Sequence, residues 1–170
     1  MYAELLTLRI IHIVGAMIWG GSSFFVSIFL LPALGTVGPA AGPVLGALVK
    51  RKTFTVVPTV AVLTMLAGLR MLWINSAGFS LTYFSGKSGL AYLLGAACAV
   101  IAFTLFMTVN HPTITRLLKM GPQIAAAPEA ERGALMAQMN ALRARAANAG
   151  MLTVLLLTVS AISMAVGRYL

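Results

Sequence analysis

The stretch from Ile10 to Leu31 reads IIHIVGAMIWGGSSFFVSIFLL and contains no Asp, Glu, Lys or Arg. A helix needs about 20 predominantly apolar residues to cross the hydrocarbon layer of a bilayer. Strands of a membrane barrel would instead alternate over about ten residues, and this run is longer and unbroken. Because lipid offers backbone groups no hydrogen-bonding partner, we expect a transmembrane helix here.

Three further stretches meet the same requirement, at roughly 54–74, 89–110 and 150–167. Of the 170 residues, 60% are hydrophobic and 9% are charged, and the mean hydropathy is +0.97. Soluble domains carry about 25% charged residues, so this composition excludes an ordinary soluble enzyme and a disordered chain. The sequence predicts an all-α integral membrane protein: one four-helix bundle over 1–170, with spans at 10–31, 54–74, 89–110 and 150–167 that run up, down, up and down.

The connection from His111 to Ala149 is the one sizeable polar segment. Within it, Pro128 suits the first turn of a helix, and acidic residues follow it directly. Apolar residues then recur at helical spacing: Leu135, Met136, Met139 and Leu142. We therefore expect an amphipathic cytoplasmic helix before the last span, continuous with that span.

The net charge of +9 comes from 12 Lys and Arg against three Asp and Glu. Eight of the cations fall on one side of the predicted bundle: Lys50, Arg51, Lys52, Arg116, Lys119, Arg132, Arg143 and Arg145. Basic residues favour the cytoplasm, which predicts that both termini lie outside. Nucleic-acid binding is excluded, because the chain lacks a soluble basic module with interleaved aromatic residues.

His12 is the ionisable side chain inside the first span. At 3.6 residues per turn, Arg9, His12, Gly15 and Trp19 fall near one face, which we expect to look into the bundle. Three interpretations of His12 stay open: a packed, hydrogen-bonded residue, an axial ligand of haem, or a proton relay. Gly15 would let a flat cofactor approach, and the indole of Trp19 needs a buried acceptor or a cofactor edge.

Other residues could complete a haem site. Arg9 and Arg70 would suit two propionates, although each also suits snorkelling to the headgroups. Met71 and Met164 are the candidates for the opposite axial position, because thioether–imidazole ligation of haem is known chemistry.

The remaining candidate ligands are less well placed. His111 is predicted to lie about 30 Å from His12 along the bundle and to end the third helix, because Pro112 follows it. Cys98, the single cysteine, is expected to be packing in the third span.

The run Arg9-x-x-His12-x-x-Gly15-x-x-x-Trp19-x-Gly21 resembles the first helix of copper-resistance D-type (CopD-like) membrane domains. It is also similar to that of their small relatives, which include the HemJ-type protoporphyrinogen oxidases. The resemblance covers about the first 75 residues. It implies a bacterial inner-membrane protein in which His12 holds haem b, with Arg9 and Trp19 around it. The lysine that HemJ-type enzymes place in a later helix has no equivalent within the third and fourth spans.

Two classes of function follow. The first is a b-type haem protein that transfers electrons or oxidises a small lipid-soluble substrate of the tetrapyrrole or quinone class. The second is a non-catalytic membrane subunit, or a copper- or metabolite-handling protein, that binds no haem and in which His12 is only hydrogen-bonded. Abundant small residues in the four spans favour a homo-oligomer in the lipid bilayer. The sequence does not identify a redox partner.

Overall fold

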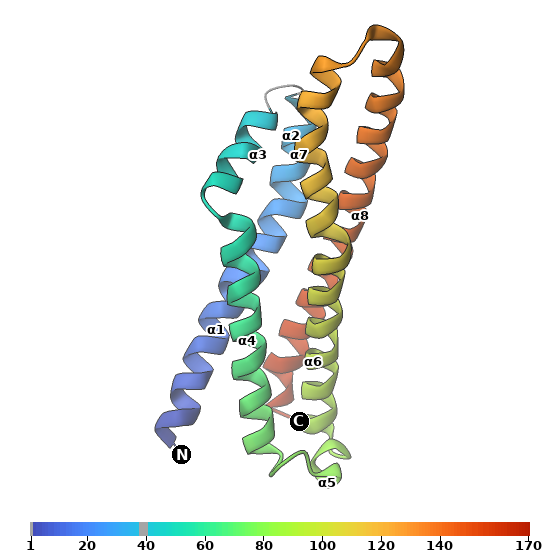
Figure 1. Cartoon of the computed structure of the whole chain (residues 1–170). Coiled ribbons are helices and arrows are strands. Elements are labelled where there is room, and N and C mark those ends of the chain that lie inside the picture. The colour runs from blue at the N-terminus through green and yellow to red at the C-terminus, as the bar shows by residue number, and fades with distance from the viewer. Residues whose placement is uncertain (1, 38–40) are drawn as a thin grey trace.

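The computed structural model describes residues 2–37 and 41–170, and all regular secondary structure in that part of the chain is helical. Four helical stretches are long and apolar enough to cross a membrane: Tyr2–Thr36, Thr53–Asn75, Lys87–Ala126 and Glu129–Gly167. The predicted all-α class with four apolar spans is confirmed. Both termini and the short helix α5 (Leu81–Phe84) lie at one end of the molecule, called the terminal end below (Figure 1).

The first long helix is α1 (Tyr2–Phe25), a π-helical turn (Val26–Leu30) and α2 (Leu31–Thr36) in succession. After it come α3 (Ala41–Lys50) and α4 (Thr53–Asn75), joined by a tight turn in which Lys52 has a φ of 56°. The predicted connection over 32–53 is therefore largely helical, and residues 38–40 within it lie outside the described part.

The third long helix consists of α6 (Lys87–Leu105), a second π-helical turn (Phe106–Asn110) and α7 (His111–Ala126). The expectation that His111 and Pro112 end this helix is wrong, and so is the predicted end at Leu31. In both places a π-turn comes first, then one residue, then a proline, Pro32 or Pro112.

The π-turns explain how the helices continue through these prolines. A proline ring in an α-helix collides with the carbonyl four residues earlier. Here the residue before each proline bonds five residues back: the Leu31 N–H donates to the Val26 carbonyl, and the His111 N–H donates to the Phe106 carbonyl. The wider turn accommodates the ring, so the helix is not broken.

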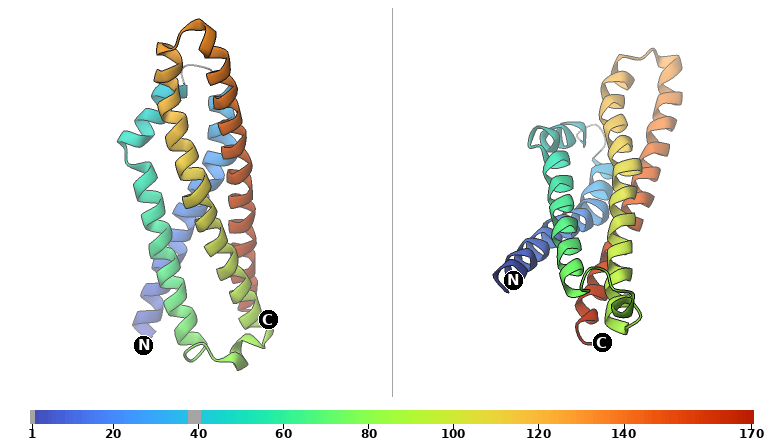
Figure 2. Two further views of the ribbon diagram at one scale, coloured as in Figure 1. Left: turned by 45° about the vertical axis from the view of Figure 1, so that its right-hand side comes forward. Right: turned by 60° about the horizontal axis from the view of Figure 1, so that its bottom comes forward.

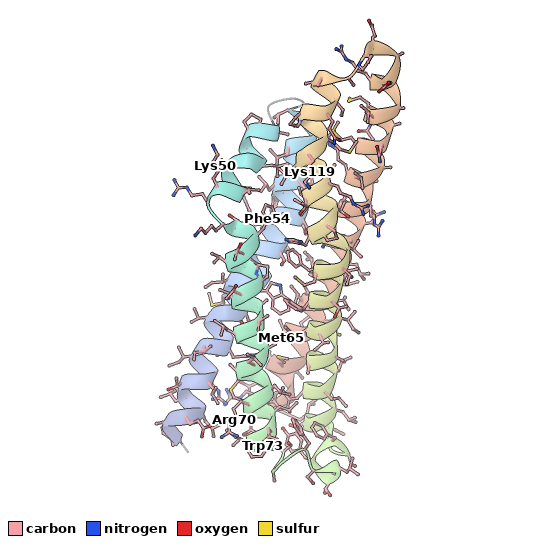
Figure 3. The ribbon with its side chains drawn as sticks, viewed as in Figure 1. Lys50, Phe54, Met65, Arg70, Trp73 and Lys119 are labelled. Carbon is pink, nitrogen blue, oxygen red and sulfur yellow. The ribbon has the colours of Figure 1, made fainter. Side chains whose placement is uncertain are left out.

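The fourth long helix, α8 (Glu129–Gly167), joins the predicted amphipathic segment and the last span without interruption. The expected continuity is confirmed. Leu135, Met139 and Leu142 are half-buried, whereas Met136 is exposed. The first part of α8 runs beside α7 at the end of the molecule that also holds Lys50 and Lys119, called the basic end below (Figures 1 and 3).

The four long helices pack chiefly as two pairs, α1 with α4 and α6 with α8 (Figure 2). The pairs meet in a small central cluster formed by Trp19, Ala61, Ala99 and Ala102. Within the second pair, the Ser160 hydroxyl donates to the Gly95 carbonyl over 2.7 Å. A Cβ on Gly95 would lie 2.9 Å from Met164 Cγ and 3.1 Å from the Ser160 carbonyl oxygen. Gly95 therefore sets how closely α6 and α8 approach.

Replacing Gly95 by Ala should weaken the α6–α8 contact, because the added methyl group meets a backbone carbonyl that cannot rotate away. We expect a loss of about 1–3 kcal/mol in the free energy of unfolding, the usual cost of overpacking a tight interface. Thermal unfolding of the detergent-solubilised protein measures it. Gly21→Ala is the matched control, because nothing lies within 4 Å of a Cβ there. Equal stability of the two variants would contradict this account.

Candidate functional site

His12 lies in the interface between α1 and α4, where its side chain is half-buried. Its Nδ1 is 2.8 Å from the backbone carbonyl oxygen of Thr64. A carbonyl oxygen only accepts hydrogen bonds, so Nδ1 carries the donated proton and Nε2 takes no part in this bond. Of the three interpretations of His12, the structure shows the hydrogen-bonded arrangement, which is also compatible with ligation through Nε2.

Two glycines, one on each helix, make this close contact fit. A Cβ on Gly68 of α4 would lie 2.7 Å from Cε1 and 2.9 Å from Nδ1 of the His12 ring. Nε2 is farther from that point, at 3.7 Å. In the opposite direction, a Cβ on Gly15 of α1 would collide with the Thr64 hydroxyl. Each helix thus places a polar side chain against a glycine of the other helix.

Trp19 lies one turn beyond Gly15 on α1 and is 4% exposed. Its ring meets Phe103 of α6 edge to face, with 6.2 Å between the centroids. The expectation that Trp19 points into the bundle is confirmed. With Ala61, Ala99 and Ala102 it forms the cluster in which the two helix pairs meet, two turns along α1 from His12.

The two arginines proposed for propionates lie in different surroundings. Nε and Nη2 of Arg70 are 2.9 and 2.7 Å from Oε1 of Glu4, and the guanidinium stands 4.8 Å from the centroid of Trp73. Arg9 is exposed, so its helical spacing from His12 does not bring it into the interface. Arg70 is already held against a carboxylate at the terminal end, where Figure 3 also places Trp73.

The proposed methionine ligands also differ in position. Met164 belongs to α8 and fills the space at Gly95, inside the second helix pair. Met71 is half-buried on α4, at the next helical position after Thr64 and Gly68 on the same face. Neither thioether has a described contact with His12, so the second axial ligand stays a prediction.

No group of three or more His, Cys, Asp or Glu side chains that could hold a metal ion occurs in residues 2–37 and 41–170. This absence concerns metal sites whose ligands are all side chains. It does not test haem binding, because the porphyrin supplies four nitrogen ligands of its own. His111 begins α7, edge-on to Phe106 with 6.4 Å between the ring centroids. Cys98 is buried, as expected for a packed residue.

A shallow hollow of about 310 Å³ lies along the α1–α4 interface. Its walls are Gly15, Thr64 and aliphatic side chains of both helices, and the aliphatic side chains of α1 there are exposed at the molecular surface. Ligand sites commonly measure about 300–1,000 Å³, so the hollow is at the lower limit for an organic molecule. His12 does not line it. The hollow offers an apolar surface beside the His12 contact and no ready-made slot at the imidazole.

No family model matches the chain, and no similar curated protein or solved structure was found. The CopD-like resemblance of the first helix therefore stays an expectation.

Thr64, whose carbonyl accepts the hydrogen bond from His12, is not among the site residues predicted from the sequence. A hydroxyl residue within an apolar span is the sequence feature that could have drawn attention to it, because polar side chains in membrane helices usually face other helices. Its pairing with His12 could not be read from the sequence, because it depends on which two helices pack together.

The contact between Gly15 and Thr64 predicts a coupled pair of substitutions. Gly15→Ala alone should lower the unfolding free energy by about 1–3 kcal/mol, because its Cβ meets the Thr64 hydroxyl. Thr64→Ala removes that hydroxyl, so the double variant should lose clearly less than the sum of the two single losses. A double-mutant cycle of thermal or denaturant unfolding measures the coupling. Strictly additive losses would show that the two positions do not touch.

Proposed function

We propose that the protein is a multi-pass protein of the bacterial inner membrane with four spans that run up, down, up and down. The basic end and the amphipathic start of α8 face the cytoplasm, because eight of the 12 cations belong to that side and basic residues favour it. Both termini and α5 are then outside. Tyr2 and Tyr169, which are 83% and 80% exposed, suit the outer headgroup layer.

We propose further that His12 is an axial ligand of b-type haem. The observation behind the proposal is the hydrogen bond from Nδ1 to the Thr64 carbonyl. Histidines that ligate metals almost always donate their other ring N–H to a carbonyl or carboxylate, which fixes the tautomer and leaves the second nitrogen for the metal. Gly68 allows the ring to take this position, and no side chain from α4 intervenes there.

The fit of the remaining residues is partial. Arg70 holds a carboxylate already, and a propionate would take the place of Glu4 against the same guanidinium. Arg9 is exposed and could approach a second propionate, and Gly15 and Trp19 are buried one and two turns farther along α1. Met71, Met164 or a ligand from a second copy of the chain would complete the coordination. Because the described cavities do not include His12, binding requires that the surrounding helices adjust.

Haem would supply one-electron chemistry at this position. The protein's own contribution is to fix the imidazole through its hydrogen bond to the Thr64 carbonyl. The exposed aliphatic surface of α1 and α4 gives lipid-dissolved molecules direct access. The proposed activity is therefore electron transfer, or oxidation of a small lipid-soluble substrate of the tetrapyrrole or quinone class.

A second candidate function rests on the same contact. His12 and Thr64 interlock with Gly68 and Gly15 closely enough to serve packing alone. In that case His12 joins α1 to α4, and the protein is a non-catalytic membrane subunit or handles copper or a metabolite without haem.

An absorption spectrum separates the two candidates. Protein purified in detergent from a haem-replete host should show a Soret band and, after reduction, an α band. His12→Ala should abolish both, whereas His111→Ala, near the basic end, should leave them largely intact. Thermal unfolding of both variants is the companion measurement, because loss of the interhelical hydrogen bond in His12→Ala also lowers stability.

Colourless wild-type protein that is nonetheless destabilised by His12→Ala would support the packing role and reject haem. If the His111 substitution alone removes the bands, His12 is not the ligand.

A further inference from the structure

A second cavity, of about 60 Å³, lies among α1, α4, α8 and the α6–α7 helix. It is about 15 residues along the first long helix from His12, a rise of about 22 Å, so it is separate from the site described above. Its surface is mainly apolar, but six polar residues also line it: Ser22, Ser23, Ser27, Thr53, Asn110 and Thr153.

Asn110 is the most informative residue of this wall. It is 6% exposed, and its Nδ2 lies 3.4 Å from Thr153 Oγ1. The Thr153 hydroxyl donates its own proton to the Ala149 carbonyl over 2.8 Å, so toward Asn110 it can only accept. This fixes the orientation of the amide: the NH₂ group faces Thr153 and Oδ1 faces elsewhere.

Asn110 Oδ1 has no hydrogen-bond partner. Among the buried side-chain nitrogen and oxygen atoms of the described residues, it is the single atom in this state. Buried polar groups in native proteins are nearly always paired with protein or with ordered solvent. A carbonyl oxygen accepts, so the missing partner must be a donor.

Both π-turns border this cavity. Val26 and Ser27 come from the first, and Phe106 and Asn110 come from the second. Single π-turns inside α-helices occur frequently at functional sites. Ser27 also packs against Gly150 of α8, where a Cβ would lie 2.7 Å from its Oγ. A close contact between the first and fourth long helices thus holds this part of the wall in place.

The chemistry of the wall restricts the ligand. None of the residues that line the cavity is Asp or Glu, and this end of the molecule holds the basic cluster Lys50, Arg51 and Lys52. Such surroundings disfavour a cation. The volume equals about two water molecules at about 30 Å³ each. The occupant is therefore small, neutral and able to donate a hydrogen bond.

We propose that this cavity is a binding site for a small neutral hydrogen-bond donor, with water as its resident form, and that Asn110 Oδ1 is the acceptor. The cavity and the hollow beside His12 share no lining residue, so the two sites are distinct. The inference does not depend on haem binding.

Asn110→Leu tests the proposal when it is compared with Thr153→Val. Leucine is similar in size to asparagine but offers no acceptor, and both substitutions break the Asn110–Thr153 hydrogen bond. If a donor occupies the cavity, Asn110→Leu also removes the acceptor of that donor, and we expect its melting temperature to lie about 3–6 °C below that of Thr153→Val. If the cavity is dry, Asn110→Leu removes an unpaired carbonyl, and its melting temperature is equal to or above that of Thr153→Val, which would contradict the proposal. Thr108→Leu, in the same π-turn but exposed, is the matched control and should change little.

A second measurement does not depend on the folding of a variant. In wild-type protein with ¹⁵N-labelled asparagine in nanodiscs, the Asn110 side-chain amide should show a magnetisation-transfer peak with water. The exposed Asn75, Asn140 and Asn148 give the reference signals. A missing Asn110 peak, or a melting temperature of Asn110→Leu equal to or above that of Thr153→Val, overturns the proposal.

Salt identity tests the neutral character of the ligand. The melting temperature should be equal in sodium, potassium and choline chloride at one concentration. A rise specific to sodium or potassium that disappears in Asn110→Leu would mean that a cation occupies the site, and the assignment of a neutral donor would be wrong.

Discussion

Close approach of helix backbones at glycine is the constraint on which this structure depends. In lipid, apolar side chains gain little by leaving the bilayer for another helix, so van der Waals packing and interhelical hydrogen bonds hold the spans together. Each close contact here sets a side chain of one helix where the other has only hydrogen: His12 at Gly68, Thr64 at Gly15, Met164 at Gly95 and Ser27 at Gly150. The polar members of these contacts are also the residues that mark the two sites.

The sequence predicts the four apolar helices well, because hydropathy over about 20 residues reflects the solvent that surrounds them. It fails where the helices end. The sequence predicts that the first span ends at Leu31 and that the third helix ends at His111, before Pro112. In each place a π-turn before the proline lets the helix continue. That outcome depends on neighbouring helices that hold the segment helical, and single-sequence propensity does not contain this information.

The candidate site shows the same division. The inward orientation of His12 and Trp19 follows from helical spacing, and the structure confirms it. The Thr64 carbonyl and the Glu4 partner of Arg70 do not follow, because they depend on which helices are neighbours and on how far along they are shifted. In the sequence, Asn110 is only a polar residue at the predicted end of the third span. Its unpaired carbonyl emerges only when the third and fourth long helices are placed together.

The two helices that meet beyond the basic end differ in their mechanics. α8 has 39 residues and no proline, and at 1.5 Å per residue it is a rod of about 58 Å, nearly twice the thickness of the hydrocarbon layer. Its neighbour is interrupted by the second π-turn. In the proposed topology, in which α8 crosses the bilayer, a lateral force on its exposed start would tilt the helix as one lever, while α7 could bend at Phe106–Asn110. A protein that binds this tip would then have a mechanical connection to the opposite side of the membrane.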